Sequence, residues 1–266
     1  MAVTGKAEPN NGSIAGLRVV VTAGASGIGR AIADTLLANG ARIAICDVSN
    51  DFLGDFGKAH PEAIALKADV AADGDVDELF AVVTREFGGL DALVNNAGIA
   101  GPTGGIDEID PAQWRRCIDI DLTGQFLCAR RAVPLIRQAG GGSIVNMSSA
   151  AGRLGYAFRT PYAAAKWGVI GLTQSLAREL GPDNIRVNAI LPGIVEGPRI
   201  DAVISARATQ LGLDHQEMER RYLEKVSLRR MVSAQDVAAM VHFLVSPAGA
   251  NISGQSIGVC GNVETL

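Results

Sequence analysis

Residues that build disulfides, metal sites and membrane spans are scarce in this chain. Four cysteines and three histidines are spread over 266 residues without a Cys-x-x-Cys pair, which argues against a disulfide framework and a zinc site. Apolar runs such as residues 17–25 and 185–192 are far shorter than the ~20 residues that cross a bilayer, and no basic and then apolar leader precedes them. We therefore expect a soluble, cytoplasmic protein that holds no metal and does not bind membranes.

A surplus of basic residues is also lacking. The net charge is −4 at pH 7 and the 24 lysines and arginines are scattered, so nucleic acid is not an expected partner. Apolar residues, by contrast, make up 48% of the chain and charged residues 20%. A chain of this length and composition buries roughly 70–75% of its unfolded surface, which is enough for a stable core.

Short β-branched runs alternate with helical patterns from residue 17 onward. Seven strands are expected, at residues 17–23, 41–47, 63–69, 90–98, 142–149, 185–193 and 255–259. Nearly unbroken apolar strands with helical crossovers are typical of parallel strands that helices cover on both faces. The sequence therefore predicts an α/β fold over residues 17–266: a single doubly wound, Rossmann-type domain with a seven-stranded parallel sheet. Residues 1–16 are small and polar and are expected to form a mobile tail.

The segments between the strands contain helical patterns and one long irregular stretch. Helices are expected at residues 31–40, 51–60, 74–87, 111–139, 161–180 and 233–245. The irregular stretch runs from Pro192 to about Leu228 and has a helical pattern of its own around residues 213–222. Because it follows the carboxyl end of a strand, where such sheets bind ligands, residues 193–228 are predicted to form a substrate lid.

A glycine-rich turn joins the first strand to the first helix. Gly24, Gly27 and Gly29 have the spacing Gly-x-x-x-Gly-x-Gly. Glycines let the backbone bend tightly around a pyrophosphate, whose charge is met by the N–H groups and the positive dipole end of the helix. A dinucleotide site is therefore predicted at this turn, in the context that makes such a motif specific.

An acidic residue closes the second predicted strand. Asp47 lies about 20 residues beyond the last glycine, where a carboxylate accepts hydrogen bonds from the adenosine ribose and repels a 2′-phosphate. The alternative is an aspartate that caps a helix or turn. No basic residue follows Asp47 directly, so NAD is the expected cofactor rather than NADP. Asp69 and Val70 would lie near the adenine, or Asp69 would begin the next helix.

A tyrosine and a lysine stand one helical turn apart. Tyr162 and Lys166 share a helix face, and Ser149 follows the fifth strand. A free phenol is almost wholly protonated at pH 7, and a neighbouring ammonium stabilises the phenolate. Tyr162 is therefore predicted to be the general base in oxidation and the acid in reduction, with Ser149 holding the reacting oxygen and Lys166 also binding the nicotinamide ribose. The alternative is that the tyrosine and the lysine lie on the exposed face of an amphipathic helix.

The chain resembles the short-chain dehydrogenase/reductase family in four motifs: Thr22 to Gly29, Asn95-Asn96-Ala97-Gly98, Ser149, and Tyr162-Ala-Ala-Ala-Lys166. The resemblance covers about residues 17–259 and implies hydride transfer between NAD(P) and an alcohol or carbonyl, in a homotetramer. It also implies a structural role for Asn95 and a nicotinamide-side loop at Pro192-Gly193. The dinucleotide contacts that it implies are Gly24, Ser26, Gly27, Ile28, Gly29, Asp47, Asp69, Val70, Asn96, Gly98 and Val195.

Two positions depart from the family pattern. Asp121, counted here among the catalytic residues, stands where the family usually has an asparagine of its proton relay. An aspartate can replace it if the main-chain carbonyl binds a water, but not if the side-chain amide must donate. We expect activity to survive. Residues 259–262 stand where many members carry an aspartate before a glycine pair.

Three arginines lie near the predicted substrate pocket. Arg153 and Arg159 belong to the loop between Ser149 and Tyr162, and Arg199 belongs to the opposite wall. Arginines there bind a carboxylate bidentately, or else point to solvent or pair with acids across a subunit contact. With Asp47 they favour an NAD-dependent dehydrogenase of a small polar hydroxy compound such as a sugar or sugar acid. The alternatives are a 3-oxoacyl thioester reductase, which normally uses NADPH, and a non-catalytic NAD-binding sensor.

Overall fold

Seven parallel strands form one sheet in the order β3-β2-β1-β4-β5-β6-β7. The structure, a computed structural model, describes residues 12–263. The order reverses between β1 and β4, which is the switch point where doubly wound sheets bind ligands. The predicted fold class is therefore confirmed, with strands β1 (Arg18–Thr22), β2 (Arg42–Asp47), β3 (Ile64–Lys67), β4 (Ala92–Asn95), β5 (Gly142–Met147), β6 (Ile185–Pro192) and β7 (Ser256–Val259).

Helices cover both faces of the sheet. One face packs against α1 (Gly27–Ala38), α2 (Asn50–Ala59) and α9 (Ala234–Val245). The other face packs against α3 (Asp73–Phe87), α5 (Gly124–Gln138) and α6 (Thr160–Leu180). Successive strand residues alternate between the two cores, since Val19 and Val21 lie on the α1 side and Val20 on the α3 side. Among residues 12–263, no helix has the length and apolar character to cross a membrane, and the cytoplasmic location stays a prediction.

The domain begins earlier in the chain than expected. Residues 1–11 of the predicted tail lie outside the described residues. Ile14, however, is fully buried in the core beside α1, and the Gly16 N–H donates to the carbonyl of Gly40 at 2.8 Å. A single isoleucine among polar residues has no periodicity, so its burial was not visible in the sequence.

The long helix expected over residues 111–139 is interrupted. A π-helical turn at Asp119–Thr123 separates α4 (Pro111–Ile118) from α5. The buried side chain of Gln125 donates to the carbonyls of Asp121 and Met147, both at 3.1 Å, and so enters the hydrogen-bond ladder of the helix. Such insertions widen one turn and are frequent at functional sites.

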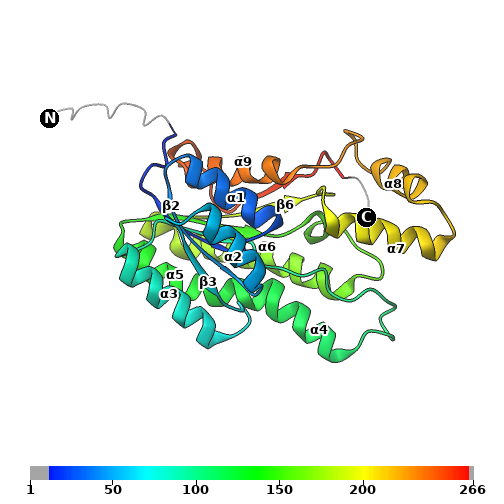
Figure 1. The fold of residues 1–266 in the computed structure, drawn as a ribbon, viewed down its shortest axis with the longest axis horizontal. Coiled ribbons are helices and arrows are strands. Elements are labelled where there is room, and N and C mark those ends of the chain that lie inside the picture. Colours follow the sequence, from blue (N-terminus) through cyan, green and yellow to red (C-terminus); the bar gives the residue numbers. More distant parts are fainter. Residues whose placement is uncertain (1–11, 264–266) are drawn as a thin grey trace.

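The predicted lid contains two helices rather than one. α8 (His215–Leu223) corresponds to the helical pattern noted in the sequence, whereas α7 (Pro198–Leu211) was not expected. The two helices lie together at one end of the molecule and share a small core of Ile204, Ala208 and Met218 (Figure 1). The apolar stripe of α7 is narrow because it packs on α8 and not on the sheet, which explains why the helix was missed.

Candidate active site

The glycine turn is held in place by its neighbours. The Gly24 N–H donates to the Cys46 carbonyl at 3.0 Å, which ties the turn to β2. A side chain at Gly29 would lie 2.0 Å from the Ala23 carbonyl oxygen, so only glycine fits there. Asn96, which follows β4, donates to the carbonyls of Thr22 and Ala23 at 3.0 and 3.1 Å. The Asn96 side chain therefore shapes the turn.

The start of α1 is open to an anion. Ser26 is the N-cap residue, but its side chain accepts no hydrogen bond from the helix, and the first turn has no acidic residue. Gly27 has a positive φ of 53°, and the space beside its Cα is open. The first N–H groups of the helix, around Ile28, thus lack a side-chain partner, and together with the helix dipole they suit a pyrophosphate.

The acidic residues at the ends of β2 and β3 differ in their surroundings. Asp47 is buried, accepts a hydrogen bond from the Ser49 N–H at 3.1 Å, and forms no ion pair among residues 12–263. Asp69 instead pairs with Arg116 of α4 at 2.6 Å. Partial burial raises the pKa of Asp69, but hydrogen bonds from the Ala71 N–H and Arg116 lower it below its usual value. Asp47 therefore keeps an unneutralised carboxylate, while Asp69 joins β3 to α4.

β5 and α6 position the three predicted catalytic side chains. Ser149 follows β5, and its hydroxyl accepts a hydrogen bond from the Ala151 N–H at 3.2 Å. Tyr162 lies in the first turn of α6, and Lys166 follows one turn later. The Lys166 Nζ lies 5.5 Å from the centre of the Tyr162 ring and donates to the Met147 carbonyl at 3.1 Å. A cation is thus held beside the phenol.

Asp121 lies in the same cluster. It is fully buried, and its Oδ1 accepts a hydrogen bond from the Ile99 N–H at 2.7 Å. Its Oδ2 lies 3.9 Å from the Lys166 Nζ. Burial raises the pKa of the Asp121 carboxyl above its ordinary value, although Lys166 and the Ile99 N–H act in the opposite direction. Gly98 packs close to both side chains, since a Cβ there would lie 3.1 Å from the Asp121 Oδ1 and 3.3 Å from the Lys166 Nζ.

The three predicted substrate arginines have different surroundings. The exposed Arg153 donates to the Ser256 carbonyl of β7 at 2.7 Å. Arg199, at the start of α7, donates to the Gly98 carbonyl at 3.0 Å and so connects the lid to the loop after β4. Arg159 is buried, and its guanidinium lies 5.2 Å from the centre of the Tyr162 ring. The structure therefore places Arg159 beside Tyr162, the predicted proton-transfer group, and gives Arg153 no such contact among the described residues.

Known proteins match nearly the whole chain. A family model described as Enoyl-(Acyl carrier protein) reductase matches residues 22–262. The chain belongs to the short-chain dehydrogenase/reductase family. A cis-4-hydroxycyclohexanecarboxylate dehydrogenase of Sinomonas cyclohexanicum is 38% identical over 93% of this chain and 96% of its own. The trans-4-hydroxycyclohexanecarboxylate dehydrogenase of the same organism is 36% identical over 91% of this chain and 90% of its own.

A solved structure of the family has the same fold. An actinorhodin polyketide ketoreductase variant crystallised with NADPH is 32% identical, covers 94% of this chain and 98% of its own, and superposes with a TM-score of 0.90. The relatives are dehydrogenases of hydroxy compounds and ketone reductases. The protein is therefore an oxidoreductase of this family that acts on secondary alcohols or ketones with a nicotinamide cofactor.

Several residues beside the family motifs were not predicted from the sequence. Tyr156 flanks Arg159, with its ring centre 5.1 Å from the guanidinium. The Sγ of Cys117 lies 4.0 Å from the Asp121 Oδ2, and burial raises the pKa of this thiol to about 11. Cys117 is four residues before Asp121, a spacing that could have revealed the contact.

Val195, a predicted cofactor contact, pairs with Val232 in an isolated β-bridge.

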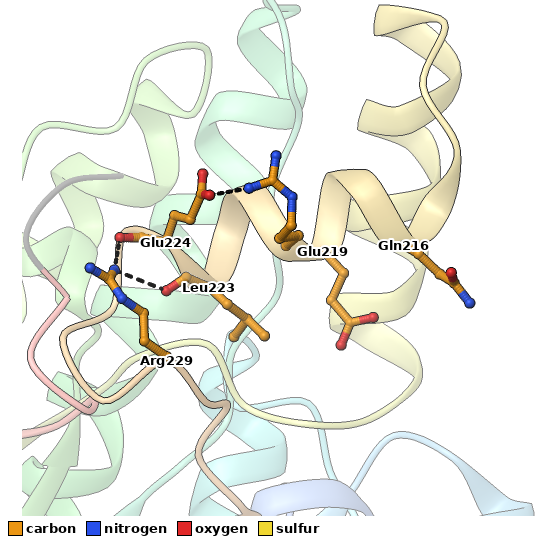
Figure 2. A pocket seen from close by; sticks show the side chains of 6 residues that line it. Gln216, Glu219, Leu223, Glu224 and Arg229 are labelled. Carbon is orange, nitrogen blue, oxygen red and sulfur yellow. Dashed lines mark hydrogen bonds and ion pairs between the residues drawn. The ribbon is translucent and has the colours of Figure 1, made fainter.

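The lid also carries a surface hollow of about 330 Å³ on α8 (Figure 2). Its lining includes Gln216, Glu219 and Leu223. The Arg229 guanidinium donates to the carbonyls of Leu223 and Glu224 and so satisfies the end of the helix. None of the motif residues of the family lines this hollow, so it is a separate feature of the lid.

Asp121→Asn is expected to change how stability depends on pH. A raised pKa means that the folded protein keeps a proton that the unfolded chain releases, so the wild type loses stability as the pH rises through that interval. The free energy of unfolding of the variant, minus that of the wild type, should therefore increase as the pH rises above about 4, the ordinary pKa of an aspartate, by about 1.4 kcal/mol for every tenfold by which folding strengthens proton binding at this carboxyl. Urea unfolding measures it, with the exposed Asp51→Asn as control. A difference that falls with pH would show that Asp121 is stabilised as a carboxylate.

Proposed function

We propose that the protein oxidises a secondary hydroxyl group of a small polar hydroxy compound with NAD⁺, and reduces the ketone in the reverse direction. The observation that carries the proposal is the pairing of Tyr162 with the buried Lys166, which donates to the last residue of β5, two residues before Ser149. The unpaired Asp47 carboxylate supports NAD, because a 2′-phosphate there would meet like charge without a neutralising cation. The sequence favoured a sugar or sugar acid as the substrate. We extend the proposed substrate class to hydroxylated ring compounds, which the names of the two relatives support.

The chain's own residues would bind the cofactor, orient the substrate and move the proton. The glycine turn, Asp47 and Lys166 would hold the cofactor, which when bound supplies or accepts the hydride. The Ser149 hydroxyl would hold the substrate oxygen, and the Tyr162 phenol would take its proton in oxidation and return it in reduction. Lys166 stabilises the phenolate, and its ammonium is kept in place by the Met147 carbonyl, with the Asp121 Oδ2 3.9 Å away.

A second candidate is the reduction of a 3-oxoacyl thioester with NADPH. The structural likeness to a ketoreductase crystallised with NADPH favours it. The free carboxylate of Asp47 opposes it, because that side chain disfavours the 2′-phosphate. The complete Ser149, Tyr162 and Lys166 set opposes the further alternative of a non-catalytic NAD sensor.

The test is NADH formation with NAD⁺ over a panel of sugars, sugar acids, polyols and cyclic alcohols. The panel includes cis- and trans-4-hydroxycyclohexanecarboxylate and their uncharged methyl esters. At least one secondary alcohol is expected to be oxidised with NAD⁺, and acetoacetyl thioesters should be reduced more slowly. Turnover restricted to thioesters and NADPH would replace the proposal with the second candidate.

The proposal includes the homotetramer that the family resemblance implies. Phe126 of α5 and Trp167 of α6 are about half exposed, so large apolar side chains are available on this side of the molecule for a contact between subunits. Light scattering measures the assembly.

A further inference from the structure

We infer that Arg159 binds a carboxylate of the substrate, so that the enzyme selects hydroxy acids over the corresponding neutral alcohols. The inference rests on the proposed function, because it assigns the substrate class of the same site. It concerns a side chain outside the Ser149, Tyr162 and Lys166 set.

Arg159 is a buried cation without an anionic partner. The residue is 7% exposed, and among residues 12–263 no carboxylate lies within ion-pair distance of its guanidinium. One terminal nitrogen donates to the Ala100 carbonyl at 2.5 Å, whereas the buried Nε has no hydrogen-bond partner. Burying a charged donor without a partner is costly, and structures retain such a group where a ligand completes it. A carboxylate is the anion whose two oxygens match the planar fork of arginine.

The guanidinium lies beside the reacting group. The ring centres of Tyr156 and Tyr162 are 5.1 and 5.2 Å from the Arg159 Cζ, so the cation lies close to both rings. Arg159 is also the N-cap residue of α6, a helix of 21 residues, so its backbone stands at the positive end of that helix. The position of Arg159 relative to Tyr162 suits a small molecule that carries its acid a few bonds from its hydroxyl.

The charges around the site also favour an anion. Three cationic side chains, those of Lys166, Arg199 and Arg159, act electrostatically on the buried Asp121 carboxyl. A neutral alcohol would leave this excess of positive charge in place, whereas a carboxylate would reduce it. Desolvated charges interact more strongly than exposed ones, so the effect on selectivity is expected to be large.

The loop before α6 holds Arg159 inward by a strained residue. Phe158 has a left-handed φ of 64°, which a bulky side chain rarely adopts, and its side chain is 54% exposed. The Phe158 carbonyl accepts a hydrogen bond from the Gly104 N–H at 3.0 Å, and the Arg159 N–H donates to the Tyr156 carbonyl at 3.2 Å. The chain thus turns Phe158 outward and Arg159 inward. Strain of this kind persists at ligand sites because the surrounding contacts impose it.

The experiment compares Arg159→Gln and Arg159→Lys with the wild type on each hydroxycyclohexanecarboxylate and its methyl ester. The ratio of kcat/KM for acid over ester should fall at least tenfold in Arg159→Gln, mainly through the KM of the acid, and less in Arg159→Lys, which keeps the charge but not the fork. Arg178→Gln removes an exposed arginine at the other end of α6 and should leave the ratio within twofold. An unchanged ratio in Arg159→Gln, or a wild type that prefers the ester, overturns the inference.

A binding measurement separates this inference from the proposed function. Cyclohexanecarboxylate, which has no hydroxyl to oxidise, is titrated calorimetrically into the protein with NADH present. Binding to the wild type that weakens at least tenfold in Arg159→Gln and less in Arg159→Lys supports the inference even if the panel shows no NAD-linked turnover. Oxidation of neutral alcohols without any binding of cyclohexanecarboxylate would leave the proposed function intact and overturn the role of Arg159. If Arg159→Gln does not fold, the binding of cyclohexanecarboxylate is compared between Arg159→Lys and the wild type instead.

Discussion

Tyr162→Phe is expected to lower kcat more than a hundredfold while the affinity for NADH stays within a few-fold. The substitution removes the one proton that the phenol transfers and almost no volume, and a positioned acid or base contributes roughly 10²–10⁴ in rate. The ring keeps its contacts with Lys166 and Arg159, so the packing of the first turn of α6 should be preserved. Steady-state kinetics and NADH fluorescence titration measure the two quantities.

Tyr156→Phe is the matched control for this change. It removes a hydroxyl from a neighbouring tyrosine and keeps the ring that flanks Arg159. It should retain activity within about threefold, because the general acid and base is untouched. More than a tenth of wild-type activity in Tyr162→Phe would mean that another group transfers the proton.

NAD⁺ is expected to be used at least tenfold more efficiently than NADP⁺, a difference of about 1.4 kcal/mol or more in transition-state stabilisation. Asp47 ends β2 beside the glycine turn, where its carboxylate is buried and has no cationic partner among residues 12–263. A 2′-phosphate placed there would lose the ribose hydrogen bonds and meet a negative charge of low solvation. The ratio of kcat/KM for the two cofactors measures the preference.

Asp47→Ala should narrow the preference for NAD⁺, because it removes both the acceptor and the repulsion. Asp51→Ala removes an exposed acid from the first turn of α2, four residues away, and should leave the ratio unchanged. Equal kcat/KM for NAD⁺ and NADP⁺ in the wild type would contradict the role of Asp47. Arginine or lysine side chains from elsewhere would then neutralise the phosphate.

Two features of the fold could not be predicted from the sequence pattern: helix α7 of the predicted lid and the helix break at Asp121. The residues of α7 repeat at helical spacing, but their apolar side packs on α8, so the stripe is narrower than that of a helix on the sheet. The π-helical turn depends on the amide of Gln125, which reaches the carbonyls of Asp121 and Met147 from a buried position. Asp121 lies one helical turn before Gln125, but Met147 lies 22 residues away on β5, beyond the reach of local periodicity.

The local sequence is enough to predict much of the fold and the site: the strands, the glycine turn, Asp47 and the Tyr162-Lys166 pair. Apolar runs and glycine spacing encode these features directly, since residues within a few positions of each other determine them. The local sequence does not predict the burial or the hydrogen-bond partners of Arg153, Arg159 and Arg199. All three lie near the motifs in sequence, yet Arg153 is exposed and donates to β7, whereas Arg199 and Arg159 both donate to the loop after β4. Arg159 differs from the other two because it is buried beside Tyr162. The fold brings the partners of a long side chain together from distant segments, so only the tertiary structure separates an exposed arginine from one buried beside Tyr162.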